Sequence, residues 1–288
     1  MTWRMRTVLL TGLTMIAFAA NSLLNRAALA DDLIDPIGFG VMRLIAGTLM
    51  LAVLILLRRK GWALFTGARI VGVLSLFTYI FGFSVAYVSL DAGFGALILF
   101  GTVQITMFGA ALAGREPLPP RRILGAGLAM LGLVWLMWPG GSGIGGTSLL
   151  HAGMMVAAGI GWGIYSLVGR MVRDPLGDTG ANFLGAALLA LALVPFLPVA
   201  PDAIIASPNG IWLAVVSGAL TSGLGYALWY HVLPRLGAAR AALAQLTVPV
   251  IALVAGVVFL GESVTLPLLA AAALVLAGVA MGIRDARR

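Results

Sequence analysis

The chain contains no cysteine, and charged residues are scarce in it. Only 10% of its 288 residues are charged, whereas soluble globular domains carry about 25%. The lack of cysteine excludes disulfides, thiol nucleophiles and thiolate metal sites. The two histidines, His151 and His231, lie far apart and lack the spacing of metal ligands. We therefore expect neither a metal site nor a cofactor.

Hydrophobic residues make up 61% of the chain, which is more than a water-soluble fold could bury. About 20 consecutive apolar residues are needed for a helix to span a bilayer. Ten such stretches occur, at roughly 7–28, 36–57, 69–89, 92–113, 121–138, 148–170, 179–198, 210–231, 238–259 and 266–283. These are continuous apolar runs rather than the alternation typical of barrel strands. The sequence predicts an all-α membrane protein with ten transmembrane helices.

The basic residues predict the orientation of these helices. All of them except Arg26 and Arg43 fall before the first stretch, after the last one, or in loops on that same side. The opposite side carries Asp31, Asp32, Asp35, Asp91, Asp202 and Glu262. Lysine and arginine remain on the cytoplasmic side of bacterial inner membranes, so we expect both termini in the cytoplasm. Basic residues dispersed in this way do not indicate a nucleic-acid partner, despite the net charge of +8.

A glycine-rich segment at 140–147 divides the chain into two halves of five stretches each, 1–139 and 148–288. An odd number of spans per half gives the two halves opposite orientations, as in inverted-repeat transporters. The halves also share weak similarity: Gly82, Tyr87, Thr102, Val103 and Glu116 match Gly225, Tyr230, Thr247, Val248 and Glu262. The segment 141–146 also spells GxGxxG. A dinucleotide site would need a preceding strand, so we interpret the segment as an external linker between repeats.

The second half carries the pattern of a known family. The run Gln245-Leu246-Thr247-Val248-Pro249, followed by Leu260-Gly261-Glu262, resembles the signature of the EamA family, and Trp162-Gly163 fits the start of its repeat. That family belongs to the drug/metabolite transporter superfamily. The resemblance implies ten helices in two inverted repeats, and it is strongest to YddG-type exporters of aromatic and other neutral amino acids.

Polar and aromatic residues at mid-depth predict the binding site, because buried amides and hydroxyls in hydrocarbon are costly to keep without use. The candidate substrate-binding residues are Asn21, Ser22, Tyr79, Phe83, Phe100, Gln104, Trp162, Tyr165, Ser222, Tyr226 and Gln245. Gly159, Gly163, Gly225 and Pro249 are interpreted as packing or hinge positions, and Pro249 also removes a backbone hydrogen bond from its helix. No Asp or Glu falls at mid-depth, so we expect an uncharged cavity without a carboxylate proton relay.

Two further features leave alternatives open. Arg43 lies inside a span, where pairing with Asp35, Asp91 or helix-end carbonyls is favoured over binding of a substrate carboxylate. Asp31-Asp32-Leu33-Ile34-Asp35 spells DDxxD, a magnesium motif in membrane prenyltransferases, although a solvated turn is the favoured interpretation. The sequence predicts a non-enzymatic inner-membrane exporter of small neutral metabolites, monomeric and acting by alternating access. The alternatives are a multidrug exporter and, more remotely, an enzyme using Asp31–Asp35.

Overall fold

The computed structural model describes residues 3–59, 61–62, 64, 67–114, 120–137, 146–169, 172–193, 196 and 205–283. Nearly all of these residues are helical, and the only strand-like pairing among them is an isolated bridge between Ile34 and Ala206. The first half forms α1 (Trp3–Leu29), α2 (Pro36–Leu57), α3 (Arg69–Ala86), α4 (Ala92–Ala113) and α5 (Pro120–Met137). The second half forms α6 (Gly146–Gly169), α7 (Pro175–Leu193), α8 (Pro208–Val216), the π-helix η3 (Ser217–Leu224), α9 (Gly225–Gln245), α10 (Thr247–Leu260) and α11 (Leu266–Ile283).

Local sequence signals set several of these boundaries. Asp35 and Ser207 occupy the N-cap positions of α2 and α8, and each accepts hydrogen bonds from backbone amides of the first turn. A proline follows each cap, where its missing N–H and fixed φ favour the start of a helix. At the end of α10, Gly261 adopts a φ of 66°, the left-handed conformation that terminates many helices.

Seven helices are long and apolar enough to cross a membrane: Met5–Leu29, Pro36–Leu57, Arg69–Ala86, Ala92–Ala113, Leu149–Gly169, Pro175–Leu193 and Pro208–Leu236. Three further apolar helices, Ile123–Gly132, Thr247–Leu260 and Leu266–Gly278, are shorter. Large apolar side chains such as Leu49, Ile70 and Phe259 are exposed on the outside of the bundle, as expected where lipid replaces water. The all-helical membrane fold is therefore confirmed, while ten membrane crossings stay a prediction.

The eighth and ninth predicted helices begin and end elsewhere than expected. The prediction placed a loop between residues 231 and 238, but α9 continues through Pro234 and ends at Gln245. The basic residue Arg235 therefore lies on a helix, and α10 is left with a short span beginning at Thr247. A proline within a transmembrane helix is tolerated when neighbouring groups satisfy the freed carbonyl, which local sequence does not reveal.

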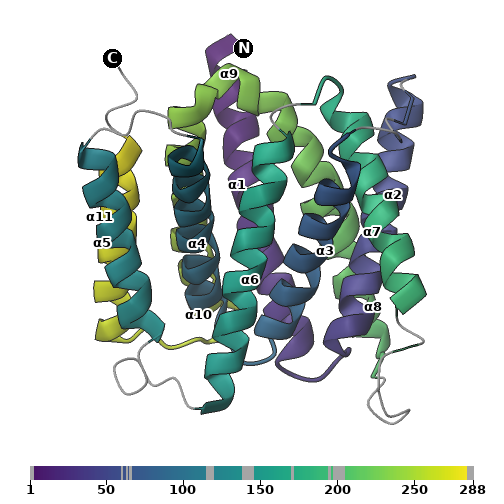
Figure 1. Cartoon of the computed structure of the whole chain (residues 1–288). Helices are drawn as coiled ribbons and strands as arrows, with labels where there is room; N and C mark the ends of the chain where they lie inside the picture. The colour runs from purple at the N-terminus through teal and green to yellow at the C-terminus, as the bar shows by residue number, and fades with distance from the viewer. Residues whose placement is uncertain are drawn as a thin grey trace.

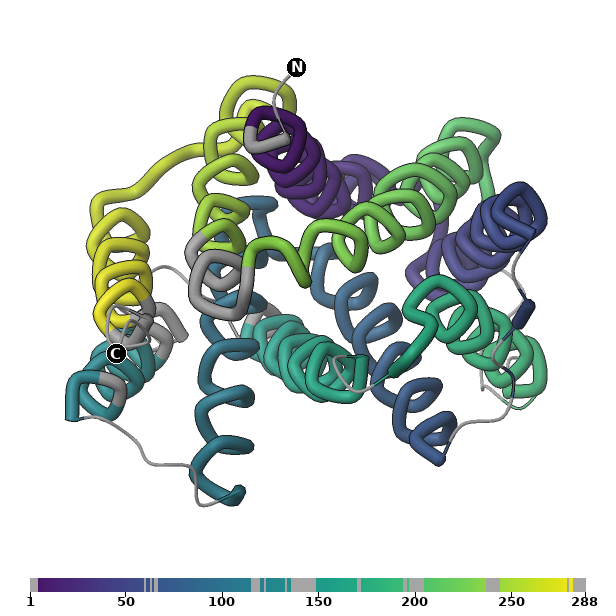
Figure 2. Tube along the Cα trace, turned by 90° about the horizontal axis from the view of Figure 1, so that it is seen from above, coloured from purple at the N-terminus to yellow at the C-terminus, as the bar shows by residue number. Residues whose placement is uncertain are grey.

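The helices stand side by side in a bundle, with α5 and α11 packed together at one edge and α2 and α7 at the opposite edge (Figures 1 and 2). Between them, α3 packs along α6, and α4 packs against both α6 and α10. Helix α1 contacts α8, η3, α9 and α10. The first turn of α1 and the last turn of α11 lie at the same end of the bundle (Figure 1).

Glycines allow α6 to contact both α3 and α4 closely. A Cβ built on Gly159 would lie 2.6 Å from Cβ of Thr102 in α4, and one on Gly163 would lie 2.8 Å from Cβ of Thr106. Gly225 makes a looser contact, with Cβ of Ala17 at 3.3 Å. The distances at Gly159 and Gly163 indicate close contact between α6 and α4. Pro249 occupies the first turn of α10, four residues after Gln245, and only Leu246 separates α9 from α10. A proline there cannot donate to the carbonyl of Gln245, so the helix is interrupted next to it.

Residues 140–145 of the proposed linker, which carry most of its GxGxxG pattern, lie outside the described residues. Gly146 is the first residue of α6. Glu116, the expected counterpart of Glu262, also lies outside the described residues. The DDxxD run is described. Asp31 and Asp32 are exposed in a turn, whereas Asp35 caps α2 by accepting from the amides of Ile37 and Gly38. Within the described part of the chain, no three His, Cys, Asp or Glu residues group as metal ligands.

Candidate functional site

A small enclosed cavity lies at the centre of the bundle, between helices of both halves. Its volume is about 10 Å³, enough for roughly one water molecule. The lining residues are Phe18, Asn21, Tyr79, Phe83, Leu99, Phe100, Trp162 and Tyr226. Six of them were predicted as substrate-binding residues from the sequence: Asn21, Tyr79, Phe83, Phe100, Trp162 and Tyr226. In this conformation the cavity is too small to hold a metabolite.

Aromatic rings form most of the cavity wall. Trp162 is central: its ring centroid lies 4.8 Å from that of Tyr226, 5.0 Å from Tyr79 and 5.8 Å from Phe18. Phe18 meets Trp162 nearly edge-on, at 84°. Edge-to-face and tilted contacts of this kind stabilise aromatic clusters beyond the burial of area.

A polar network flanks the aromatic wall and joins α1 to η3. The amide oxygen of Asn21 accepts hydrogen bonds from the hydroxyls of Ser217 (2.8 Å), Thr221 and Ser222 (3.4 Å). The wider turn of the π-helix brings these three hydroxyls to the same side, and π-helical segments recur at functional sites. Deeper in α1, Asn25 accepts from Ser84 of α3 at 3.3 Å. The network is buried throughout.

Arg43 of α2 joins this network from outside the cavity, whose lining residues are all uncharged. It is fully buried, with Nε donating to the hydroxyl of Ser222 at 2.9 Å and Nη2 donating to that of Tyr79 at 3.0 Å. Its guanidinium carbon lies 5.3 Å from the centroid of the Tyr79 ring and 5.1 Å from that of Phe83. The predicted partners Asp35 and Asp91 are therefore wrong. The cavity borders a permanent cation.

Close contact between α2 and η3 explains how Arg43 reaches the centre. A Cβ on Gly218 would lie 2.3 Å from the carbonyl oxygen of Arg43 itself, and one on Gly47 would lie 3.1 Å from the carbonyl oxygen of Gly218. Only glycine permits this backbone approach. Sequence analysis noticed Arg43 but assigned it a structural pairing, because the contact with Ser222 joins residues that are 179 positions apart.

The remaining predicted site residues lie beside the cavity or away from it. Ser222 accepts a hydrogen bond from Arg43 and donates one to Asn21, which lines the cavity. Tyr165 stacks on Trp162, with ring centroids 5.7 Å apart. Ser22 is buried on α1 next to Asn21 but does not line the cavity. Gln104 is half-buried one turn beyond Phe100. Gln245 is the last residue of α9, at the far end of that helix from Tyr226, because the helix continues past Pro234.

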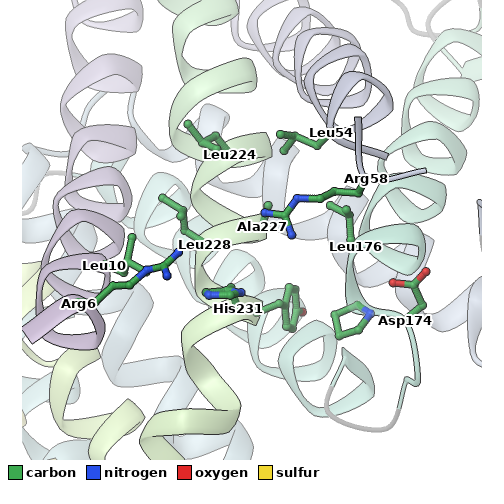
Figure 3. Close-up of a pocket in the computed structure, with 12 residues that line it drawn as sticks. Arg6, Leu10, Leu54, Arg58, Asp174, Leu176, Leu224, Ala227, Leu228 and His231 are labelled. Carbon is green, nitrogen blue, oxygen red and sulfur yellow. The ribbon is translucent and has the colours of Figure 1, made fainter. Parts of the chain in front are cut away.

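A larger pocket opens at the end of the bundle where α1 begins. This vestibule has a volume of about 310 Å³. Its lining comes from α1, α2, η3, α9 and the start of α7: Arg6, Leu10, Leu54, Arg58, Asp174, Pro175, Leu176, Leu224, Ala227, Leu228, Tyr230 and His231. Arg6 and Arg58 extend toward each other from α1 and α2, with His231 between them (Figure 3). Tyr230 lies one helical turn from Tyr226, so the vestibule adjoins the central cavity along α9.

The opposite end of the bundle is closed by charged and backbone contacts between the two halves. Arg26 of α1 lies 3.5 Å from Asp91 and 3.8 Å from Glu262, and donates to the carbonyl of Val88 at 3.0 Å. Glu262 also accepts from the amide of Ala92 at 2.7 Å. Burial raises the pKa of Glu262 above its ordinary value, although the Ala92 amide and Arg26 act in the opposite direction. We call Arg26, Asp91 and Glu262 the ionic cluster.

Backbone pairing reinforces this closure next to the ionic cluster. The amide of Asp35 donates to the carbonyl of Ile205 at 2.9 Å, and that of Ser207 donates to Leu33 at 2.8 Å. These bonds join the loop after α1 to the segment before α8. Two loops far apart in the sequence are thereby held together at this end of the bundle.

Comparisons with known proteins agree with this architecture. Residues 150–283 match the model of the EamA-like transporter family. An uncharacterised protein of Pseudomonas aeruginosa is 46% identical over 96% of this chain and 94% of its own length. The threonine/homoserine exporter RhtA of Escherichia coli is 28% identical, covering 93% of this chain and 90% of the exporter.

A solved crystal structure superposes with a TM-score of 0.69 at 20% identity, over 99% of both chains, and so shares the fold. An uncharacterised transporter of Archaeoglobus fulgidus is 26% identical over 87% of this chain and 90% of its own. The second half carries the family pattern, the relatives extend over nearly the whole chain, and the helices form a polytopic membrane bundle around a central cavity. The chain is a multi-pass membrane protein that belongs to the EamA-like transporter family of the drug/metabolite transporter superfamily.

Proposed function

We propose that this protein exports small neutral amino acids across the inner membrane by exposing its central cavity alternately to each side. One observation carries the proposal. A buried cavity with polar and aromatic walls is closed toward one end by the ionic cluster and adjoins an open vestibule at the other. Access from one side at a time is the geometry that alternating access requires.

Helix packing supports an inverted repeat formed by residues 1–139 and 148–288. In such a repeat α1, α2, α3 and α4 correspond to α6, α7, the helix that contains η3, and α10. The contact between α3 and α6 then corresponds to the contact between η3 and α1. In the same way, the α4–α6 contact corresponds to α10–α1 and the α2–η3 contact to α7–α3, and all of these contacts are present. All helices around the cavity come from one chain, so a monomer suffices for the site.

Charge distribution supports cytoplasmic termini and a cytoplasmic vestibule. Arg6, Arg58 and Arg235 line the vestibule or the small pocket next to it, at the end where α1 begins. The acidic residues Asp91 and Glu262 lie at the opposite end, in the ionic cluster. Basic residues remain in the cytoplasm, so the vestibule would receive substrate from inside the cell.

The substrate class follows from the cavity and from the relatives. RhtA is named a threonine/homoserine exporter, which favours small neutral amino acids over the larger aromatic ones expected from YddG-type proteins. Hydroxyls, amides and ring faces suit a zwitterion with a short side chain. The buried guanidinium of Arg43 would repel cationic drugs, which disfavours the multidrug alternative.

Reconstituted flux tests this function. Purified protein in liposomes should exchange labelled threonine, homoserine and other neutral amino acids in a saturable manner. Trp162→Ala removes the central ring of the cavity and should lower the exchange rate at least about tenfold. Trp212→Ala is the matched control, since Trp212 lies on α8 with 66% of its surface exposed, and it should leave the rate unchanged. Absence of exchange for every amino acid in the wild type would refute the substrate class.

The ionic cluster provides a test of the closed end. Arg26→Gln leaves two carboxylates without their cation, so closure should weaken and the deep part of α1 should become accessible from outside. The chain lacks cysteine, so a thiol introduced by Ser22→Cys, one turn before Arg26, reports this access without background. Labelling of intact cells by an impermeant maleimide should accelerate several-fold when Arg26→Gln is added. Arg59→Gln, an exposed position elsewhere, is the control.

Glu262→Gln should act in the opposite direction from Arg26→Gln. The pKa of Glu262 is raised in the closed arrangement, whereas an exposed Glu262 in an open arrangement would keep its ordinary value. Protonation therefore favours closure, which is strengthened as pH falls and is lost as pH rises through the raised value. The neutral glutamine mimics the protonated state and should slow labelling. Faster labelling in this variant would show instead that the ion pair with Arg26 stabilises the closed end more than burial of the carboxylate opposes it.

A further inference from the structure

Arg43 is a buried cation to which the described residues offer no anion. Its side chain is fully excluded from solvent, and no described carboxylate lies within ion-pair distance of it. The other arginine deep in an interface, Arg69, pairs with Asp178 at 2.8 Å. An intramembrane charge is costly unless it is paired or hydrated, so a cation kept without an anion indicates a ligand that supplies one.

The contacts that Arg43 does make fix its orientation without neutralising it. Ser222 accepts from Nε and Tyr79 accepts from Nη2, and both hydroxyls are neutral. The ring faces of Tyr79 and Phe83 stabilise the cation further, at 5.3 and 5.1 Å. Ser222 is itself held by Asn21. The guanidinium is therefore held in one position beside two residues of the cavity wall, Tyr79 and Phe83.

Hydrogen-bond donors around the cavity remain unused. The Nη1 group of Arg43 is buried and makes no hydrogen bond to the described residues, and neither do the indole N–H of Trp162 or the hydroxyl of Tyr226. Trp162 and Tyr226 line the cavity, and Arg43 contacts two further lining residues by donating to the Tyr79 hydroxyl and by lying 5.1 Å from the Phe83 ring. Buried polar groups without partners are rare in folded proteins. Of the seven found among the described residues, two belong to cavity-lining residues and a third to Arg43.

We propose that Arg43 binds the carboxylate of the transported substrate through Nη1, with Trp162 and Tyr226 as further donors. This inference rests on the proposed transport function and adds the group by which substrates are selected. One guanidinium matches a single negative charge. A phosphate dianion would need a second cation, and the remaining unused donors are neutral. The cavity thus selects monocarboxylates, including α-amino acids, and rejects their amides and esters.

Comparison of acid and amide tests this assignment. In liposomes, the wild type should exchange threonine at least about tenfold faster than threonine amide, because the amide lacks the charge that Arg43 pairs with. Arg43→Gln should lower threonine exchange at least about tenfold and remove the preference for the acid. Arg43→Lys keeps the charge but loses the planar fork, so it should retain an intermediate preference. An acid-to-amide ratio in Arg43→Gln equal to that of the wild type would overturn the proposal.

Controls separate binding from structure. Arg59→Gln removes an exposed arginine that lines neither the vestibule nor the cavity, and it should preserve the acid-to-amide ratio. Thermal unfolding of Arg43→Gln should match or exceed that of the wild type, because the substitution removes a buried charge without an anion. A structural role would instead lower the unfolding temperature and reduce acid and amide exchange equally, which would also overturn the proposal.

A binding measurement keeps the inference testable if the transport function fails. Trp162 forms part of the cavity wall, so a bound ligand should change its fluorescence emission. Subtracting the spectrum of Trp162→Phe removes the contribution of the other tryptophans. Short monocarboxylates should alter this emission in the wild type and not in Arg43→Gln, while the corresponding amides alter it in neither. If no monocarboxylate gives an Arg43-dependent change, the site assignment is wrong whether or not amino acids are exchanged.

Discussion

Gly161→Leu should abolish exchange and sharply reduce the yield of folded protein. A Cβ at position 161 would lie 2.7 Å from the carbonyl oxygen of Ser75 and 2.9 Å from the amide nitrogen of Tyr79, both of which are backbone atoms of α3. Backbone cannot rotate aside as a side chain does, so α3 and α6 would have to separate. Tyr79 and Trp162 come from these two helices, so their separation would open the wall of the cavity.

The same helix offers a matched control for this substitution. Gly153 lies on the exposed side of α6, and a Cβ there would meet nothing within 4 Å. Gly153→Leu should therefore express, unfold and exchange substrate as the wild type does, whereas overpacking at position 161 costs several kcal/mol, on the order of 3 or more. Thermal unfolding in detergent and flux in liposomes measure the difference. Equal unfolding temperatures for the two variants would show that the α3–α6 contact is not as tight as described.

Asp178→Ala should lower the unfolding temperature strongly. Asp178 is 4% exposed and joins α7 to α3 by accepting from Nη2 of Arg69 at 2.8 Å and from Asn182 at 3.0 Å. Removing one partner of a buried pair leaves the other charge uncompensated and costs about 3–5 kcal/mol. For a chain of this size, that corresponds to a decrease of roughly 6 °C or more.

The control for Asp178→Ala is Asp31→Ala, because Asp31 is exposed in the turn after α1. We expect its unfolding temperature to stay within about 1 °C of the wild type, as for most surface substitutions. The double variant Asp178→Ala with Arg69→Leu should recover part of the lost stability, since an apolar side chain can replace a buried pair. A double variant less stable than Asp178→Ala would contradict the assignment of the loss to an unpaired charge.

Much of the site could be predicted because it depends on the depth of polar residues in apolar helices. Asn21, Tyr79 and Trp162 were identified on that ground, and the structure brings them to one cavity. Gln245 was assigned to the same depth by a predicted break near Pro234. The helix continues through that proline, which moves Gln245 to its end. A proline ends a helix or is accommodated within it depending on the neighbouring groups, and these are tertiary.

The partners of Arg43 also could not be predicted from the sequence. Its place within a span was evident from the sequence, and the nearest acidic residues in the chain were the natural candidates for pairing. The π-helix and the glycines at 47 and 218 instead bring α2 against η3, so its partners are neutral hydroxyls. Neither a π-helical turn nor a close backbone approach leaves a periodic signal in hydropathy.

The sequence by itself determined the membrane environment, the positions of most helices and the segregation of charge between the two ends. These properties depend on local composition, because a helix in lipid satisfies its own backbone and needs only length and apolarity. Tertiary structure alone decided that Arg43 borders the cavity, that Arg26 joins Asp91 to Glu262, and that the vestibule lies at the opposite end. Each of these depends on side chains from distant segments meeting in one place, which follows from how the helices pack.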